Sequence, residues 1–237
     1  MKKKNFFKTI FNIYKKENTI PKVDLHVHTN WTDGKHSVEE MVNSACKLKI
    51  QALLFSEHSR KTSKGWFNKF AKEIKSCRKK IKNECKLFIG TEVKIKDFDG
   101  SLDISPVIRK KSDLVMASVH RFPGEVGNIY NSKPNISKQE AIEIEYKLTL
   151  KAIQNSKFDI VGHPFGMSIK RFKAKPNWKL FKSLISACKK HDKAFEINFH
   201  YHKNYRKLLN ECIKSNTLFS LGSNAHEKKE VGKILSI

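Results

Sequence analysis

Residues 23–58 read VDLHVHTNWTDGKHSVEEMVNSACKLKIQALLFSEH. Apolar runs near Val23–Val27 and Ala52–Phe55 predict two short strands. Between them, Ser37–Leu48 has the pattern of a helix, with Ser37 as its N-cap and acidic residues in its first turn. A strand, a helix and a second strand in this order are typical of a unit with parallel strands.

The same alternation continues through the rest of the chain. Further strands are predicted near Leu87–Val93, Leu114–Val119, Asp159–Gly162, Ala194–Asn198 and Leu218–Gly222. Helical patterns cover Phe67–Lys82, Lys138–Asn155, Lys179–His191 and Tyr205–Ser215, and Gly100–Arg109 and Arg121–Pro134 are the longest irregular loops. Seven strand and helix units in one domain predict an α/β fold, a TIM-like (β/α)7 barrel with one unit fewer than usual.

The 237 residues fit one domain of ordinary size, which we place at residues 21–237. Residues 1–20 form a basic amphipathic extension whose apolar side chains could line one face of a short helix. Lys8 and Asn12 interrupt the apolar part, and no small-residue cleavage site follows, so a signal peptide is not expected. We expect a helix packed on the barrel, with a membrane-surface anchor as the alternative.

Charge and cysteine content limit the partners and the compartment. The chain has 48 Lys and Arg against 23 Asp and Glu, a formal net charge of +25, which would attract phosphate esters, nucleotides or nucleic acid. A coding bias toward Lys, Asn and Ile is the alternative explanation, and no basic-aromatic motif accompanies the charge. The five cysteines show no C-x-x-C pairing, and no apolar run approaches the roughly 20 residues that span a bilayer. We therefore expect reduced thiols and a cytoplasmic protein.

Polar residues recur where the predicted strands end. His26 and His28 lie two apart in an extended segment, so both side chains can face the same side and bind one ion. The other strand ends carry His58, Glu92, His120, His163 and His226. Burying an unpaired imidazole or carboxylate is costly, and a metal ion removes that cost. In a barrel of this type the carboxyl ends of the strands carry the active site, so the pattern predicts a multinuclear metal site and a metal-dependent hydrolase.

The combined motifs resemble those of the PHP (polymerase and histidinol phosphatase) family from about Val23 to His226. The motifs are His26-Val27-His28-Thr29 with a following Asp-Gly, Ser56-Glu57-His58, Gly90-Thr91-Glu92, the strand-ending His120, Gly162-His163-Pro164 and Gly222-Ser223-Asn224-Ala225-His226. The segments GTEVKIKDFDGSLD, IVGHPFG and FEIN are similar to the small stand-alone phosphatases of that family. The resemblance implies a distorted seven-stranded barrel that holds two or three divalent ions, usually zinc, manganese or iron.

The resemblance also implies a role for each matching residue. His26 and His28 would hold a first ion with Glu92 and Asn224, and Glu92 would bridge to a second ion held by His120 and His163. Asp33, His58 and His226 would hold a third ion, with His36 as an alternative to Asp33. Glu92 and His226 would then be catalytic residues, because two cations sharing a carboxylate lower the pKa of a bridging water and produce a hydroxide that attacks phosphorus.

The expected substrate is a small phosphorylated metabolite, such as a nucleotide, hydrolysed as a phosphomonoester. Arg121, Lys170 and Arg171 are the basic side chains expected to bind it, the last two from the loop after His163. Nucleic acid is an additional partner that the charge allows but the mechanism does not require. The oligomeric state is not visible in the sequence.

Two departures from the family pattern matter. Asn224 replaces the usual Asp and brings no negative charge, while Glu57 replaces an Asp and is expected to support a ligand rather than bind metal. An amidohydrolase is less favoured, because Glu92 occupies the bridging point and Asn224 the late catalytic one. Histidinol phosphatase and a catalytically impaired module that binds nucleic acid or a protein remain the alternatives, whereas an exonuclease is less favoured because no polymerase domain is attached.

Overall fold

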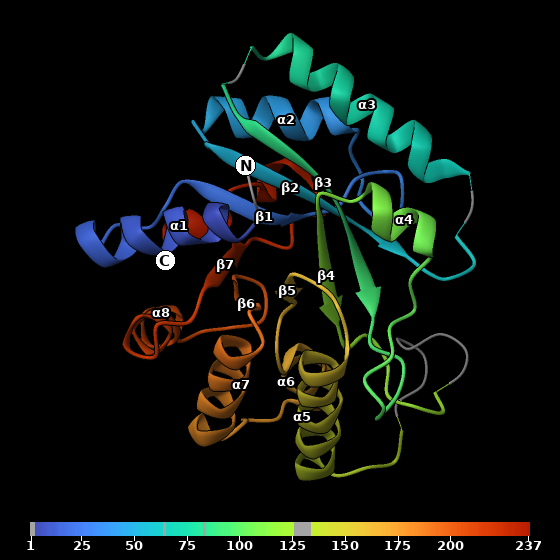
Figure 1. The fold of residues 1–237 in the computed structure, drawn as a ribbon, viewed down its shortest axis with the longest axis vertical. Coiled ribbons are helices and arrows are strands. Elements are labelled where there is room, and N and C mark those ends of the chain that lie inside the picture. The colour runs from blue at the N-terminus through green and yellow to red at the C-terminus, as the bar shows by residue number, and fades with distance from the viewer. Residues whose placement is uncertain (1–2, 64, 83, 126–133) are drawn as a thin grey trace.

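The computed structural model of the chain describes residues 3–63, 65–82, 84–125 and 134–237. Within them, seven parallel strands form one sheet in the order of the sequence (Figure 1). These are β1 (Val23–Val27), β2 (Ala52–Ser59), β3 (Lys86–Lys94), β4 (Leu114–Ser118), β5 (Ile160–Val161), β6 (Ala194–Asn198) and β7 (Phe219–Gly222).

The sheet closes into a barrel between its first and last strands. Val27 forms a parallel bridge with Ala225, just beyond β7, and the His28 N–H donates to the Ala225 carbonyl at 2.8 Å. The predicted (β/α)7 barrel is therefore confirmed. β2 is longer than expected, so His58 lies within the strand and pairs directly with Glu92 of β3.

Eight α-helices accompany the strands in the described residues. They are α1 (Lys3–Glu17), α2 (Val38–Lys47), α3 (Trp66–Lys80), α4 (Pro106–Lys111), α5 (Lys138–Asn155), α6 (Gly166–Phe172), α7 (Trp178–Lys190) and α8 (Tyr205–Lys214). Capping boxes begin α2 and α5, because Ser37 pairs with Glu40 and Ser137 pairs with Glu140. None of these helices combines the length and the apolar character that crossing a membrane requires.

Two loop predictions need correction. α4 begins at Pro106, within the segment 100–109 for which the sequence predicts an irregular loop, and ends at Lys111, and α6 occupies the segment after His163. Both helices are too short to show a clear apolar period in the sequence. Of the predicted loop 121–134, residues 126–133 lie outside the described part of the chain.

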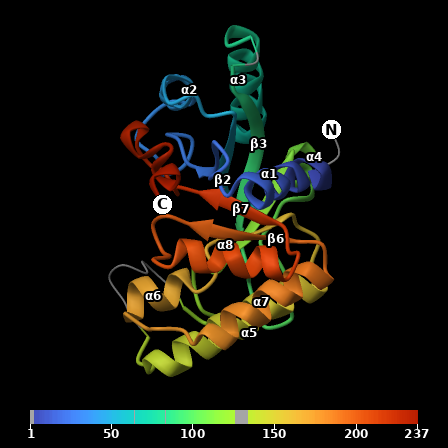
Figure 2. The same ribbon diagram turned by 90° about the vertical axis from the view of Figure 1, so that its left-hand side faces the viewer.

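The helices divide between two sides of the barrel, as the two views show (Figures 1 and 2). α2 and α3 cover β1 to β3 and enclose one apolar cluster, whereas α5, α7 and α8 lie beside the later strands and enclose the larger one. α1 joins the larger cluster through Phe6, Phe7, Ile10, Phe11 and Tyr14. The helix expected within residues 1–20 is therefore part of the core.

Candidate metal centre

The carboxyl ends of the strands bring six histidines and two carboxylates together. We call this set the histidine cluster: His26, His28, Asp33, His58, Glu92, His120, His163 and His226. The sequence predicts each member as a ligand, because it follows an apolar run or lies in the loop behind one. Parallel strands place their carboxyl ends at one mouth of the barrel, which explains how residues 200 positions apart meet.

Glu92 lies at the centre of the cluster and is buried. Its Oε2 is 3.5 Å from His26 Nε2, 3.6 Å from His28 Nε2 and 3.2 Å from His58 Nδ1. Its Oε1 is 3.1 Å from His120 Nε2 and 2.9 Å from His163 Nε2. The five imidazoles form a closed ring around the carboxylate, with neighbouring ring centroids 4.6 to 5.7 Å apart. The two oxygens of Glu92 thus face two separate groups of nitrogens.

Asp33 collects a second group on the exposed side of the cluster. Its Oδ2 is 3.2 Å from His226 Nε2 and 3.3 Å from His58 Nε2, and its Oδ1 is 3.7 Å from His28 Nδ1. His36, the alternative to Asp33, is engaged elsewhere, because its Nδ1 accepts the Lys228 N–H at 3.3 Å. The geometry therefore favours Asp33.

The cluster holds its carboxylates ionised and at least one imidazole neutral. Although burial alone would raise it, the surrounding histidines, His120 and His26 first, hold the pKa of Glu92 well below its usual range. Burial, with His58 and His26 nearby, lowers the pKa of His28 well below its ordinary value. An anionic oxygen and neutral imidazole nitrogens are the protonation states in which these side chains bind metal.

The residues fit a set of divalent ions. His28 Nδ1 and His120 Nε2 are buried without a hydrogen-bond partner, although His120 Nε2 lies within ion-pair distance of Glu92. His26 Nε2 and His28 Nε2 are only 3.0 Å apart. Three groups have ligand atoms close enough to share an ion: His26, His28 and Glu92; His58, Glu92 and His120; and His28, Asp33, His58 and His226. Buried imidazole nitrogens that converge on one another and on a shared carboxylate are an arrangement that a metal ion would satisfy.

Glu196 of β6 contacts two members of the histidine cluster, and the sequence did not predict it. It is fully buried; its Oε1 accepts a hydrogen bond from His26 Nδ1 at 2.7 Å and its Oε2 accepts the His163 N–H. A carboxylate can only accept here, so a His26 hydrogen lies on Nδ1, and Nε2 points at His28 and Glu92, where a metal would take its place among the ligands. Gly222 makes room for this carboxylate, since a Cβ at that position would overlap Glu196 Oε1 and His26 Cβ. The signal in the sequence that could have revealed Glu196 is a charged residue inside the otherwise apolar strand Ala194–Asn198.

Two other side chains support the cluster. Ser118 Oγ donates to Glu92 Oε1 at 2.6 Å and orients the carboxylate. Glu57 lies outside the cluster and accepts from the Thr29 N–H, the Thr29 hydroxyl and the Thr32 hydroxyl. It therefore ties down the loop that carries Asp33, which agrees with a supporting role.

Asn224 lies beside the cluster in a left-handed backbone conformation, with φ of 54°. Asn is one of the residues that tolerate this conformation. Its carbonyl oxygen is 2.9 Å from His226 Nδ1, so the backbone of Asn224 fixes the ring that faces Asp33. A ligand role for the Asn224 amide remains a prediction.

The three basic residues expected at the substrate lie in different settings. Lys170 and Arg171 are on α6 rather than in a loop, and Arg121 follows His120 directly. Arg171 makes a two-point ion pair with Glu125, at 2.7 and 3.1 Å, with both side chains largely buried. That pairing ties α6 to the segment after β4 and makes Arg171 the less favoured anion ligand.

Lys170 is better placed to meet a substrate. It is exposed, its Nζ is 2.7 Å from His200 Nε2 and it lies 5.5 Å from the centre of the Tyr201 ring. Tyr201 in turn packs on His163, with centroids 4.6 Å apart. Lys170 and His200 thus form a basic edge one aromatic ring away from the histidine cluster.

A buried carboxylate positions the helix that carries Lys170. Glu145 of α5 accepts the Met167 N–H at 3.1 Å and the Ser168 N–H at 2.7 Å, and burial raises its pKa to about 7. The turn before α6 contains His163 and Phe165 at φ of 26° and 65°. Gly166 is required in this turn, because a Cβ there would overlap the His163 ring. Docking of α6 therefore fixes His163.

Comparison with known proteins agrees with this arrangement. A family model described as PHP domain matches residues 24–200. The DNA polymerase/3'-5' exonuclease PolX of Bacillus subtilis (strain 168) is 28% identical over 184 residues, which are 75% of this chain and 29% of that protein. A probable phosphatase of Thermoanaerobacter sp. (strain X514) is 26% identical over 221 residues, which are 89% of this chain and 81% of that protein.

A solved structure shares the fold. The histidinol phosphate phosphatase of Lactococcus lactis subsp. lactis Il1403, in complex with zinc, L-histidinol and phosphate, superposes with a TM-score of 0.65 at 20% identity. The alignment covers 91% of this chain and 93% of that one. At this identity the likeness concerns the fold alone.

Proposed function

Since the chain belongs to the PHP domain family, we propose that it is a metal-dependent phosphoesterase that hydrolyses a phosphomonoester, a nucleotide or another small phosphorylated metabolite. It is a phosphoric ester hydrolase, the class of enzyme to which its relatives named as probable phosphatases belong. The observation that carries the proposal is Glu92, whose two oxygens face two groups of imidazole nitrogens in a buried site.

The residues that would hold the ions follow from the contacts. Glu92 Oε2 would join His26 and His28, with the Asn224 amide as a further ligand, and Glu92 Oε1 would join His120 and His163. Asp33, His58 and His226 would hold a third ion on the exposed side. Zinc, manganese and iron all suit this mixture of imidazole and carboxylate, and such ions supply Lewis acidity toward phosphoryl oxygens and water.

The protein groups then divide the remaining work. Glu92 and His226 are the residues we assign to catalysis, Glu92 as the shared anionic ligand and His226 as the ring that faces the open side with Asp33. Lys170 is the favoured contact for the phosphoryl anion, with Arg121 next, and Arg171 would first have to leave Glu125. Cationic donors near a phosphoryl group add charge-assisted hydrogen bonds that position the substrate.

The test is hydrolysis of para-nitrophenyl phosphate by protein that is stripped of metal and then reloaded with manganese or zinc. We expect turnover to disappear with the metal and to return on reloading. Glu92→Ala should lose bound metal and at least a hundredfold in activity, on the order of what loss of a principal catalytic group costs. Glu143→Ala, which removes an exposed glutamate of α5, is the matched control and should retain both. Hydrolysis that persists after metal removal would contradict the proposal.

The variant Asn224→Asp separates an active enzyme from an impaired one. A carboxylate at this position adds a negative charge next to the cluster, so metal should bind more tightly. If the unmodified protein is inactive and only Asn224→Asp hydrolyses the ester, the chain is an impaired module and its net charge of +25 favours a polyanionic partner. Salt-dependent binding to single-stranded DNA, measured by fluorescence anisotropy, would then identify that function.

A further inference from the structure

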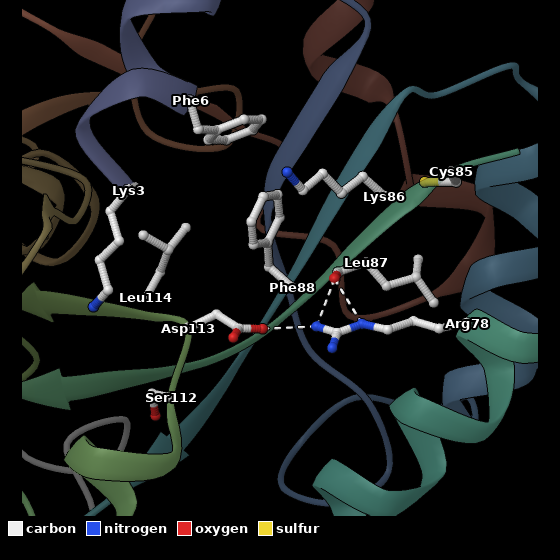
Figure 3. Close-up of a pocket in the computed structure, with 10 residues that line it drawn as sticks. All are labelled: Lys3, Phe6, Arg78, Cys85, Lys86, Leu87, Phe88, Ser112, Asp113 and Leu114. Atoms are coloured by element: carbon white, nitrogen blue, oxygen red, sulfur yellow. Dashed lines mark hydrogen bonds and ion pairs between the residues drawn. The ribbon is translucent and has the colours of Figure 1, made fainter. Parts of the chain in front are cut away.

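A hollow of about 530 Å³ opens beside the first residues of β3 and β4 (Figure 3). This is the amino-terminal mouth of the barrel, the end opposite the histidine cluster. The walls of the hollow come from four elements: Lys3 and Phe6 of α1, Arg78 of α3, Lys86 and Phe88 of β3, and Leu114 of β4. Lys86 and Glu92 are six residues apart on β3, which corresponds to about 20 Å of extended chain. The hollow is therefore separate from the metal centre.

The hollow exists because α1 fills only part of this mouth. Phe11 and Tyr14 of α1 pack against Phe219 of β7, with ring centroids 6.2 and 5.9 Å apart. At the other end of α1, Lys3 bonds to Asp159 at 3.0 Å, just before β5. The helix thus spans the mouth, and its first turn, through Lys3 and Phe6, borders the hollow beside the first residues of β3 and β4.

Positive charge dominates the walls. Lys3, Arg78 and Lys86 come from three different elements, while Asp113 is the carboxylate among the lining residues. The Arg78 guanidinium forms an ion pair with the Asp113 carboxylate at 2.7 Å. It also donates two hydrogen bonds to the Leu87 carbonyl, at 2.7 and 3.0 Å, and these contacts fix the floor of the hollow. Asp113 and Asp159 offset two of these three cations, so the surface keeps an excess of one positive charge, which attracts anions.

The remaining wall is aromatic. The rings of Phe6 and Phe88 lie 4.7 Å apart at an angle of 51°, and Leu114 continues the apolar surface. Lys86 Nζ is 5.0 Å from the centre of the Phe88 ring and 5.7 Å from that of Phe6, so a cation and two rings share one corner (Figure 3). Sites for small molecules have volumes of about 300 to 1,000 Å³ and combine apolar walls with a few polar groups.

We propose that this hollow binds a small organic anion that carries a planar ring and has the size of a nucleoside monophosphate. The anionic group is held at the rim by Lys86 and by Lys3, which keeps Asp159 as a second partner, and the ring packs against Phe6, Phe88 and Leu114. Arg78 keeps its contacts with Asp113 and the Leu87 carbonyl, and its positive charge adds to the electrostatic attraction for the anion. Binding here does not require metal, because the histidine cluster lies at the other mouth of the barrel.

The test uses 8-anilinonaphthalene-1-sulfonate, which joins planar rings to one anionic group, in a fluorescence titration of the metal-free protein. We expect one saturable site. Lys86→Glu, and independently Lys3→Glu, should weaken binding about tenfold, because each replaces attraction by repulsion at the rim. Lys182→Glu changes the net charge equally at an exposed position of α7 and should stay within twofold of wild type. Circular dichroism verifies that each variant is folded.

A second arm excludes the metal centre as the binding site. Glu92→Ala disrupts the histidine cluster and should leave the dye affinity within twofold, and adenosine 5′-monophosphate should displace the dye from that variant. Loss of dye binding in Glu92→Ala, unchanged affinity in both rim variants, or failure of the nucleotide to compete would each overturn the proposal. None of these measurements depends on turnover, so the proposed hydrolase activity and the proposed second site are tested independently of each other.

Discussion

A single buried carboxylate organises the metal centre at the scale of residues. Glu92 is stabilised in its ionised form by imidazoles on both sides, and Ser118 donates to the same oxygen that faces His120 and His163. Removing metal from such a site leaves one anion among five rings that cannot all satisfy their nitrogens. We therefore expect metal binding and local order to be strongly coupled.

Glu196 should control metal affinity without touching the metal. In Glu196→Gln, one of the two acceptor oxygens becomes an NH2 group that faces either the Nδ1–H of His26 or the His163 N–H. Loss of such a supporting carboxylate typically costs 10- to 100-fold in metal affinity. We expect a decrease of this size, measured by competition with a chromophoric chelator, and a matching fall in turnover at limiting metal.

The exposed substitution Glu143→Gln on α5 is the control for this experiment. It makes the same chemical change away from the cluster and should leave affinity unchanged. Equal metal affinities for Glu196→Gln and wild type would show that His26 keeps its orientation without the carboxylate, which would contradict the assigned role.

The sequence predicted the members of the cluster but not this support. His58, His120 and His163 each stand at the end of an apolar run, where a buried polar group needs a partner, and this logic requires no knowledge of the fold. Glu196 lies inside β6, and only the barrel places its oxygens between His26 and His163. Contacts between strands one, five and six are long-range and leave no local signature.

At the scale of elements, His202 joins β6 to the turn before α6. Its Nδ1 accepts the Asn198 N–H at 3.0 Å and its Nε2 donates to the Pro164 carbonyl at 3.0 Å. Burial lowers the pKa of His202 from 6.5 to about 4, since a second proton on Nδ1 would point at the Asn198 N–H. The ring is therefore held in its neutral form.

Acid should loosen this junction. Because the pKa of His202 is lower in the folded state, its contribution to stability is present above pH 6.5 and is lost as the pH falls toward 4. Between pH 7.5 and pH 5 we expect metal-free wild type to lose about 2 kcal/mol more free energy of unfolding than His202→Asn, which keeps an acceptor near Nδ1 but does not titrate. Urea unfolding at the two pH values measures the difference, and parallel losses in the two proteins would disprove it.

Element boundaries were predictable where helices are long and capped. α5 can be predicted from its capping box at Ser137 and from several turns of periodic apolar pattern. α4 and α6 have only six and seven residues and show no such period. α6 also begins from a turn with positive φ at His163 and Phe165, a conformation that depends on Gly166 and on Glu145 of another helix. Tertiary contacts rather than local propensity therefore define these short helices.

At the scale of the whole molecule, α1 spans the amino-terminal mouth of the barrel, opposite the metal centre. Its apolar face joins the main core, while Lys4 and Lys8 remain exposed. A helix held only by its surface charge would detach in high salt, but one with five buried apolar side chains is an integral part of the fold. The helix should therefore contribute to global stability rather than to membrane attachment.

Phe11→Ala tests this conclusion. Phe11 is 5% exposed and packs against Phe219, so truncation leaves a cavity that should lower the free energy of unfolding by about 3 to 5 kcal/mol. The neighbouring exposed substitution Asn12→Ala should change it by less than about 0.5 kcal/mol. Since the cluster lies at the opposite mouth, metal affinity below the unfolding transition should be the same in both variants. A Phe11→Ala protein as stable as wild type would mean that α1 is not docked in solution, and its apolar face would then be free to bind a membrane surface, which vesicle sedimentation would detect.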